Sequence, residues 1–156
     1  MDRDPGASVD RRYYSLDEVN ALVPALASIF TRVMQLRGQL KTLHKKLEDK
    51  RFAPVGDDFE PSVPGAPPEV VRDRMIFKGL VETLKSDLAT VGELGCSIKD
   101  LDIGLVDWLA RNGDRDIYLC WRFGEREVAF FHDLDAGFAG RRPVAELRPA
   151  RPRAVT

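Results

Sequence analysis

The stretch that decides the fold is LVDWLARNGDRDIYLCWRFGEREVAFFHD, residues 105–133. Its apolar and polar residues alternate in short runs rich in β-branched and aromatic side chains, a pattern typical of β-strands. Asn112-Gly113 is a strong signal for a type I′ hairpin turn, and Gly124-Glu125 suits a type II′ turn. The stretch therefore predicts three antiparallel strands joined by two tight turns.

The two turns also predict the register of this meander, which spans 104–134. The first turn pairs Trp108 with Ile117, and the second pairs Ile117 with His132. One face is then almost entirely apolar and must pack on the rest of the chain. The residues predicted on it are Val106, Trp108, Ile117, Leu119, Trp121, Phe123, Val128, Phe130 and His132. Those predicted on the opposite face are Leu105, Asp107, Tyr118, Cys120, Arg122, Glu127, Ala129 and Phe131.

Two long helices are predicted before the meander. The motif SLDE at 15–18 has the spacing of a capping box, and the apolar residues behind it recur in steps of three and four, which predicts a helix over 15–49. Pro24 lies beyond the first turn and is expected to kink or interrupt this helix. A flexible loop over 50–66, rich in proline and glycine, leads to a second helix over 67–94. Helices joined in this way are expected to lie antiparallel.

The two ends of the chain differ in composition from the middle. Residues 1–12 are charged and poor in apolar side chains, which predicts a disordered leader. Residues 143–156 are rich in arginine and proline, which predicts a basic, disordered tail. The middle, 13–142, is expected to form a single α+β domain. Its predicted fold is a long antiparallel helical hairpin packed on one face of a three-stranded antiparallel β-meander.

The composition excludes several classes of protein. Of 156 residues, 24 are Lys or Arg and 25 are Asp or Glu, a net charge of −1 that argues against a general binder of nucleic acid or anionic lipid. The longest uncharged stretch, 19–31, is shorter than the ~20 apolar residues that span a bilayer. Two cysteines are too few for a disulfide framework. We therefore expect a cytoplasmic protein that does not contact a membrane.

Four segments are distinctive: SLDEVNALVP at 15–24, GLVDW at 104–108, YLCWRFGE at 118–125 and HDLDAGFAGR at 132–141. In their order and in these residues they resemble a bacterial family, the domain-of-unknown-function family 2203. The likeness leaves out both ends of the chain. No activity is established for this family, so the resemblance supports the architecture and implies no mechanism.

His132, Asp133 and Asp135 lie close together in the sequence, and imidazole with carboxylate is suited to metal binding or to acid–base chemistry. Neighbouring strand residues point to opposite faces, so His132 and Asp133 cannot share one ion while the strand continues. The simpler interpretation is structural, with His132 hydrogen-bonded at the edge of the core and Asp135 shaping a turn. The alternative is a ligand or metal site completed by a distant residue, for which Glu18 and Asp107 are candidates.

Five further residues belong to the face opposite the core. Arg122 and Glu127 are predicted to form a cross-strand ion pair. Asp107 is predicted across from Tyr118, where an acid beside a phenol suits a small polar ligand, although a wet rim or a subunit contact is the interpretation we favour. Cys120 behaves most simply as a small buried hydrophobe, because no histidine is predicted beside it.

The loop GFAGR at 137–141 combines glycines with Arg141. Glycines let a backbone approach phosphate closely, and arginine binds phosphate bidentately. No strand followed by a helix comes after it, since Pro143 and the tail intervene, so phosphate-binding loop fingerprints do not apply. We expect Phe138 to close the core instead.

Two classes of function stay open. The one we favour is a non-enzymatic, homo-oligomeric interaction module, a homodimer through the coiled-coil-like stripe of its long helices. The alternative is a small-ligand or metal-binding site, with or without enzymatic activity, around His132, Asp135 and Arg141. Contact of the arginine-rich tail with nucleic acid or another polyanion is a third expectation, which we do not favour. The sequence specifies no cofactor. The stripe expected at the dimer interface is Leu26, Ile29, Val33, Leu36 and Leu40.

Overall fold

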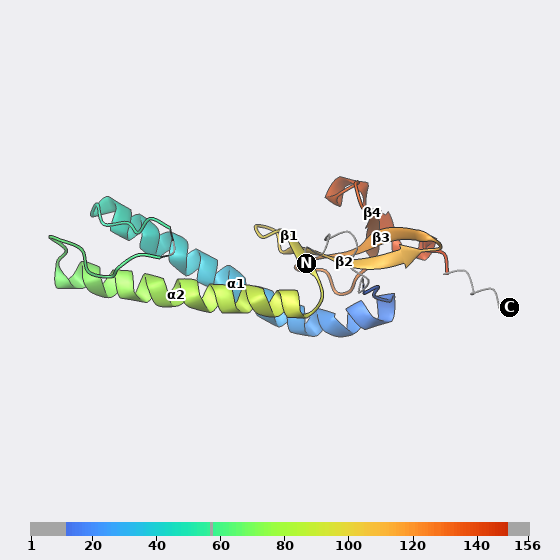
Figure 1. Cartoon of the computed structure of the whole chain (residues 1–156), viewed down its shortest axis with the longest axis horizontal. Coiled ribbons are helices and arrows are strands. Elements are labelled where there is room, and N and C mark those ends of the chain that lie inside the picture. The colour runs from blue at the N-terminus through green and yellow to red at the C-terminus, as the bar shows by residue number, and fades with distance from the viewer. Residues whose placement is uncertain (1–11, 57, 150–156) are drawn as a thin grey trace, which may run out of the picture. The chain divides into compact units, whose positions relative to one another are not determined.

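The computed structural model describes residues 12–56 and 58–149 (Figure 1). These residues form two compact units, where the sequence predicts one domain. The sheet unit comprises the described residues up to Ala27 and from Leu94 onward, and the hairpin unit comprises Ser28–Glu93. The predicted leader lies outside the described residues except for Arg12.

Both predicted helices are present, and their bounds agree with the sequence analysis to within one residue. The capping box forms, because the Ser15 N–H donates to Glu18 Oε1 at 3.0 Å and the Glu18 N–H donates to Ser15 Oγ at 3.1 Å. Pro24 lies inside the first helix without ending it. The helices are α1 (Leu16–Asp49) and α2 (Pro68–Glu93).

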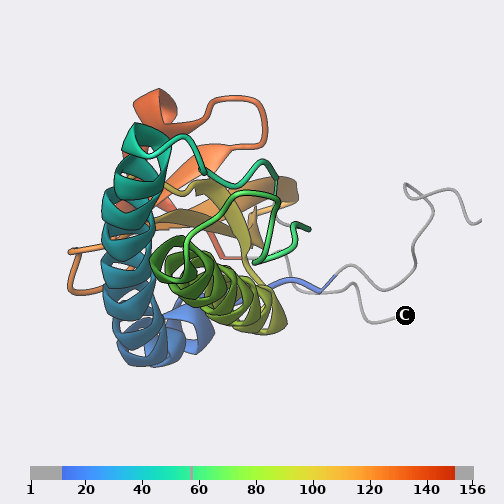
Figure 2. The same cartoon turned by 90° about the vertical axis from the view of Figure 1, so that its left-hand side faces the viewer.

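Ion pairs in the hairpin unit show that α1 and α2 run antiparallel (Figures 1 and 2). Near the start of this unit, Arg32 forms two hydrogen bonds with Asp87, at 2.6 and 2.9 Å. Near the end of α1, Lys46 lies 2.9 Å from Asp73, at the beginning of α2. An early residue of one helix thus pairs with a late residue of the other, as expected for a helical hairpin.

The loop between the helices is held in place by Arg74 of α2. Its guanidinium donates to the carbonyl oxygens of Glu60 and Pro61, at 2.9 and 3.1 Å, and to that of Phe52. Phe59 of the same loop is buried, with its ring 5.8 Å from that of Phe77. The described part of the loop is therefore anchored, although its composition predicts a flexible segment.

By length and composition alone, α1 is long and apolar enough to cross a membrane. Within the protein, 39% of its most apolar 18-residue segment is buried. Core helices of soluble proteins meet the same criterion, so it is weak evidence for a membrane span.

The sheet unit contains five antiparallel strands in sequence order, not the three that the sequence predicts. The two additional strands are short and form the two edges. The α+β class is confirmed. The strands are β1 (Ser97–Asp100), β2 (Leu105–Asn112), β3 (Arg115–Arg122), β4 (Phe130–Asp133) and β5 (Arg142–Pro143).

The first hairpin differs from the predicted register by two residues. Trp108 pairs with Leu119 and not with Ile117, because Gly113-Asp114 occupies the turn in place of Asn112-Gly113. Gly113 has a φ of 60°. A shift of two residues returns each side chain to the same face of the strand. The predicted core face of β2 and β3 is therefore correct even though the partners are wrong.

The second hairpin differs by one residue, which exchanges the faces of β4. Leu119 pairs with Phe131 and Tyr118 pairs with His132, so the prediction that Phe130 and His132 face the core is wrong. Residues 123–129 form a wide connection and not a two-residue turn.

Two hydrogen bonds hold this connection. The Trp121 Nε1–H donates to the Glu125 carbonyl at 3.0 Å, and the Val128 N–H donates to Asn20 Oδ1 of α1 at 2.6 Å. The second of these bonds ties the connection to α1.

The core of the sheet unit lies between the first part of α1 and one face of the sheet (Figures 1 and 2). The Trp108 Nε1–H, although buried, donates to the Leu94 carbonyl at 3.1 Å. The fully or almost fully buried apolar residues of this core are Val19, Val23, Leu26, Val106, Trp108, Ala110, Ile117, Leu119, Trp121, Val128 and Phe131.

The predicted tail begins inside the sheet unit. Arg142–Pro143 forms β5 beside β4, and a 3₁₀ turn follows over Val144–Glu146. The Arg148 N–H then donates to Asn112 Oδ1 at 2.7 Å, and the Arg148 carbonyl accepts from Gly113 N–H at 3.1 Å. The prediction of disorder is therefore wrong for the first part of 143–156, and residues 150–156 lie outside the described residues.

Gly95, at the exit from α2, provides a test of this fold. Its φ is 87°, in the left-handed region that favours glycine, and an added Cβ would overlap the Tyr14 ring. We expect Gly95→Ala to lower the free energy of unfolding by about 1–3 kcal/mol. Gly79→Ala, in open space on α2, is the matched control and should raise it by about 0.4–1 kcal/mol. Urea denaturation measures both, and equal stabilities would contradict the conformation of Gly95.

Candidate functional site

Three strands bring Asp107, Cys120 and His132 together on the face of the sheet opposite the core. Asp107 of β2 pairs with Cys120 of β3, and His132 of β4 lies on the same face as both. All three are at least 97% buried. A nitrogen, a sulfur and an oxygen donor atom, one from each side chain, lie within 4.8 Å of one another.

The hydrogen bonds of His132 determine where its protons lie. Nδ1 is 2.8 Å from the Asp133 carbonyl oxygen, and a carbonyl only accepts, so Nδ1 carries a proton and donates it. Nε2 is 3.0 Å from Asp107 Oδ2. If the imidazole were neutral, with its proton on Nδ1, the lone pair of Nε2 would face a carboxylate oxygen. Both atoms would then be hydrogen-bond acceptors, and they would repel each other. The contact is favourable only if one further proton lies between the two side chains.

Asp107 also carries an oxygen that lacks a partner. Its Oδ1 is buried and accepts no hydrogen bond from the described residues. A buried acceptor without a donor costs about 1–3 kcal/mol, and more when it is charged. This makes Asp107 the least satisfied side chain of the cluster.

Cys120 is a thiol and not a thiolate in this environment. Burial raises the pKa of Cys120 to about 12, and the negative charge of Asp107 acts in the same direction. Burial raises the pKa of Cys96 to about 12 as well. Neither cysteine is therefore an activated nucleophile near neutral pH.

A cavity of about 280 Å³ opens over Asp107 and His132. The segment that follows β4 forms one wall, and β1 supplies Lys99, whose ammonium lies 5.0 Å from the centre of the Tyr118 ring. The Tyr118 ring is 5.6 Å from the His132 ring, centre to centre. The lining residues are Lys99, Leu105, Asp107, Tyr118, His132, Leu134, Asp135, Gly137 and Phe138.

Arg141 anchors the end of this wall to the sheet unit. Its Nη2 donates to both Glu125 oxygens, at 2.6 and 2.9 Å, while its Nε has no partner among the described residues. The guanidinium also lies over the Phe130 and Phe138 rings, at 4.2 and 4.9 Å from their centres. Arg141 is thus engaged by the protein, and the structure does not place it in the pocket as the sequence analysis proposed.

The other residues that the sequence singled out are divided between the pocket and distant positions. Tyr118 and Asp135 line the pocket. Glu18 lies at the start of α1, where the Ser15 N–H and then Arg12 lower the pKa of its carboxyl. Arg122 pairs with Leu105 across the sheet.

The predicted pair of Arg122 with Glu127 is wrong, because Glu127 belongs to the wide connection and not to a strand. Tyr118 pairs with Leu109 in place of Asp107. Lys99 was missed, because the sequence does not predict β1.

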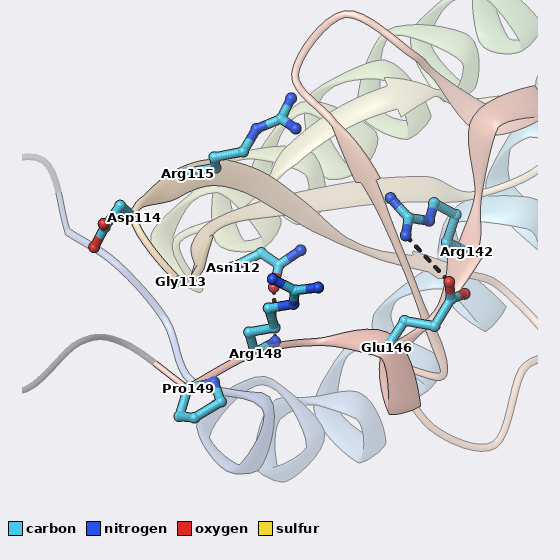
Figure 3. A pocket seen from close by; sticks show the side chains of 8 residues that line it. All are labelled: Asn112, Gly113, Asp114, Arg115, Arg142, Glu146, Arg148 and Pro149. Atoms are coloured by element: carbon cyan, nitrogen blue, oxygen red, sulfur yellow. Dashed lines mark hydrogen bonds and ion pairs between the residues drawn. The ribbon is translucent and has the colours of Figure 1, made fainter.

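A second cavity, of about 760 Å³, lies beside the turn between β2 and β3 (Figure 3). Arg115, Arg142 and Arg148 line it, together with Asp114 and Glu146. Arg142 donates to Glu146 Oε1 at 3.1 Å, as Figure 3 shows. The two acidic side chains thus offset part of the charge of the three arginines, and all five of these charged side chains are exposed. The pocket over Asp107 and His132 is the better candidate site because these two polar side chains are buried.

Contact of the tail with a polyanion stays a prediction. Because Arg142 to Pro149 takes part in the sheet unit, a truncation that tests it should begin after Pro149 and leave β5 intact.

Fold and site together define an α+β protein with a buried Asp–Cys–His cluster on its sheet. The chain matches the family described as "Uncharacterized conserved protein (DUF2203)" over residues 12–144, and it belongs to that family. The resemblance found in the sequence is thereby confirmed. No curated protein and no solved structure matched the chain.

The Asp107–His132 contact can be tested by a double-mutant cycle in buffer that contains a chelator. We expect His132→Ala and Asp107→Ala each to lower the free energy of unfolding by about 3–5 kcal/mol, because each leaves the other buried polar side chain without its partner. The double variant should lose less than the sum by at least about 1 kcal/mol.

The control is Glu146→Gln, which breaks the exposed pair with Arg142 and should cost less than about 1 kcal/mol. Additive effects of His132→Ala and Asp107→Ala in urea denaturation would contradict the coupling.

Proposed function

We propose that the sheet unit binds a small ligand in the pocket over Asp107 and His132, and that this ligand supplies a hydrogen-bond donor or a cation to Asp107. The observation that carries the proposal is the unpartnered, buried Asp107 Oδ1. Buried polar atoms in proteins nearly always have a partner. A buried carboxylate oxygen beside a cavity is therefore a position that a ligand completes.

The size and lining of the pocket support a ligand of few atoms. Its 280 Å³ lies just below the range of about 300–1,000 Å³ that is usual for drug-sized ligands. Leu105, Leu134 and Phe138 supply apolar surface, and Lys99 and Tyr118 supply polar groups near the edge. This combination is typical of sites in which apolar contacts give affinity and a few polar groups fix orientation.

The proposal is for binding and assigns no reaction. Nucleophilic catalysis by Cys120 is disfavoured, since burial raises the pKa of its thiol to about 12. The Asp107–His132 contact resembles an acid–base pair, but its protons are held within the protein.

Titration of the labelled protein with small probes, followed by NMR of the backbone amides, tests this function. The probes are methylammonium, guanidinium, acetamide and, separately, the chlorides of Mg²⁺ and Zn²⁺. We expect at least one probe to shift the amides around Asp107 and His132, and Asp107→Asn to abolish the shift because it removes the carboxylate.

The matched control is Asp17→Asn, an exposed position of the sheet unit that should leave binding unchanged. Lys99→Ala, at the exposed rim of the pocket, should strengthen binding of the cationic probes because it removes a like charge, and it should leave binding of neutral acetamide nearly unchanged. If no probe shifts these amides at millimolar concentration, the pocket is not a binding site.

We also propose that the chain forms a homodimer through its hairpin unit. What supports this is an apolar groove of about 930 Å³ between the helices, with Ile76 49% exposed at its edge. A two-helix hairpin has a single internal seam, and a second copy would complete a four-helix bundle. The groove is lined by Met34, Gln35, Gly38, Gln39, Thr42, Leu43, Lys46, Ile76 and Leu80.

This surface replaces the stripe that the sequence analysis expected at the interface. Leu26, Ile29, Val33 and Leu36 are buried within the chain itself and are not free to meet a partner, and Leu40, the fifth residue of the stripe, is half-buried. A cytoplasmic location is a further proposal, which the two cysteines outside any disulfide, Cys96 and Cys120, support.

Sedimentation equilibrium at micromolar concentration tests the dimer. We expect about twice the chain mass of 17.5 kDa. Ile76→Glu should give the monomer, because it places a charge in an apolar interface, whereas Ser86→Glu on the exposed part of α2 should remain dimeric. A monomeric parent protein would contradict the proposal.

A further inference from the structure

We infer that the ligand of this pocket is a divalent transition-metal ion, held by Asp107, Cys120 and His132, and that zinc is the ion that fits these donors best. The inference rests on the proposed function and narrows it to one class of ligand. Three features of the cluster carry it: the spacing of its donor atoms, the orientation of His132 and the balance of charge.

The spacing is close to what one ion needs. Donor atoms at about 2.0–2.3 Å from a tetrahedral zinc lie roughly 3.3–3.6 Å from one another. The donors of Asp107, Cys120 and His132 all lie within 4.8 Å, and Asp107 Oδ2 is 3.0 Å from His132 Nε2. Small side-chain movements would therefore bring all three onto one ion without a change in the sheet.

The orientation of His132 is that of a metal ligand. Histidines that bind metals usually donate their second ring nitrogen to a carbonyl or a carboxylate, which fixes the tautomer and aims the lone pair at the ion. Here Nδ1 donates to the Asp133 carbonyl at 2.8 Å, and Nε2 points toward Asp107. A cation placed between Nε2 and Asp107 would take over the role of the proton that the contact otherwise needs.

The charges also match a divalent ion. When the ion binds, the proton of the Cys120 thiol and the proton shared by Asp107 and His132 are both lost to solvent. Asp107 then contributes one negative charge, Cys120 contributes another as a thiolate, and His132 stays neutral. Two negative charges on the protein then balance a dication, so that the buried site carries no net charge. This balance matters because an uncompensated charge in a buried position is very costly. The bound ion would also place a positive charge near Asp107 Oδ1, the buried oxygen that accepts no hydrogen bond from the described residues.

The chemistry of the donors selects the ion. Magnesium and calcium prefer oxygen ligands alone, whereas one sulfur, one nitrogen and one oxygen suit zinc. Three protein ligands leave one tetrahedral position free for water or another small molecule, as in zinc sites that exchange ligands. The cavity lined by Lys99 and Tyr118 is the open side of the cluster.

The experiment uses the full chain, purified without a metal-affinity tag, stripped with a chelator and titrated with Co²⁺ and Zn²⁺. We expect one Co²⁺ per chain, with the visible bands of tetrahedral cobalt and a near-ultraviolet thiolate-to-cobalt band. Competition with a chromogenic chelator then gives the affinity for Zn²⁺. Cys120→Ser should remove the thiolate band and weaken Zn²⁺ binding by at least about tenfold.

Cys96→Ser is the matched control, since Cys96 is also a buried thiol of the sheet unit but does not belong to the cluster. It should keep both the band and the affinity. If Cys120→Ser keeps them too, the ion binds elsewhere and the inference is overturned. His132→Gln provides a second test through loss of the tetrahedral bands, in case Cys120→Ser fails to fold.

The outcomes separate this inference from the proposed function. If methylammonium, guanidinium or acetamide shifts the amides around Asp107 while neither metal binds, the pocket is a ligand site and the metal assignment is wrong. If no probe and no metal binds, both proposals fall, and the cluster is a structural hydrogen-bonded pair beside a buried cysteine.

Discussion

The pairing of β4 with β3 is the constraint on which the site depends. It places His132 opposite Tyr118 and therefore on the same face as Asp107 and Cys120. A slip of one residue would send His132 into the apolar core and bring Phe131 out of it. The wide connection between these strands is hydrogen-bonded to Asn20 of α1, the helix whose first part covers the opposite face of the sheet.

Much of the fold follows from local sequence signals, and the part that does not follow depends on contacts between distant residues. The capping box at Ser15 and the apolar period predict α1 correctly, because both act within a few residues. The predicted core face of β2 is correct even though the predicted register of the first hairpin is wrong by two residues. An error of one residue in the second turn reverses the predicted face of β4, and the wide connection found there includes a Val128–Asn20 hydrogen bond between residues 108 positions apart.

The sequence indicates which residues are candidates for the site, but it does not predict how the strands arrange them. Asp107 and His132 were both candidates from the sequence, and Asp107 was considered as the distant partner of His132. The predicted register puts no histidine beside Cys120, so the sequence indicates only a small buried hydrophobe there, whereas the observed register brings His132 to the same face. Arg141 suggested a phosphate contact, whereas its guanidinium is occupied by Glu125 and two aromatic rings. Lys99 lies on the edge strand β1, which is too short for an alternation of apolar and polar residues to be recognised in the sequence.

The sheet unit is discontinuous along the chain, and this affects the order in which it can fold during synthesis. Its first apolar residues, Val19, Val23 and Leu26, leave the ribosome before the whole hairpin unit, and the strands that bury them come after it. At about 5–20 residues per second, the 28–93 segment takes about 3–13 s to make. During that time the start of α1 has no sheet to cover, while the hairpin unit already contains both of its helices. The sheet unit therefore has to be completed last, on a helix whose other end is already folded.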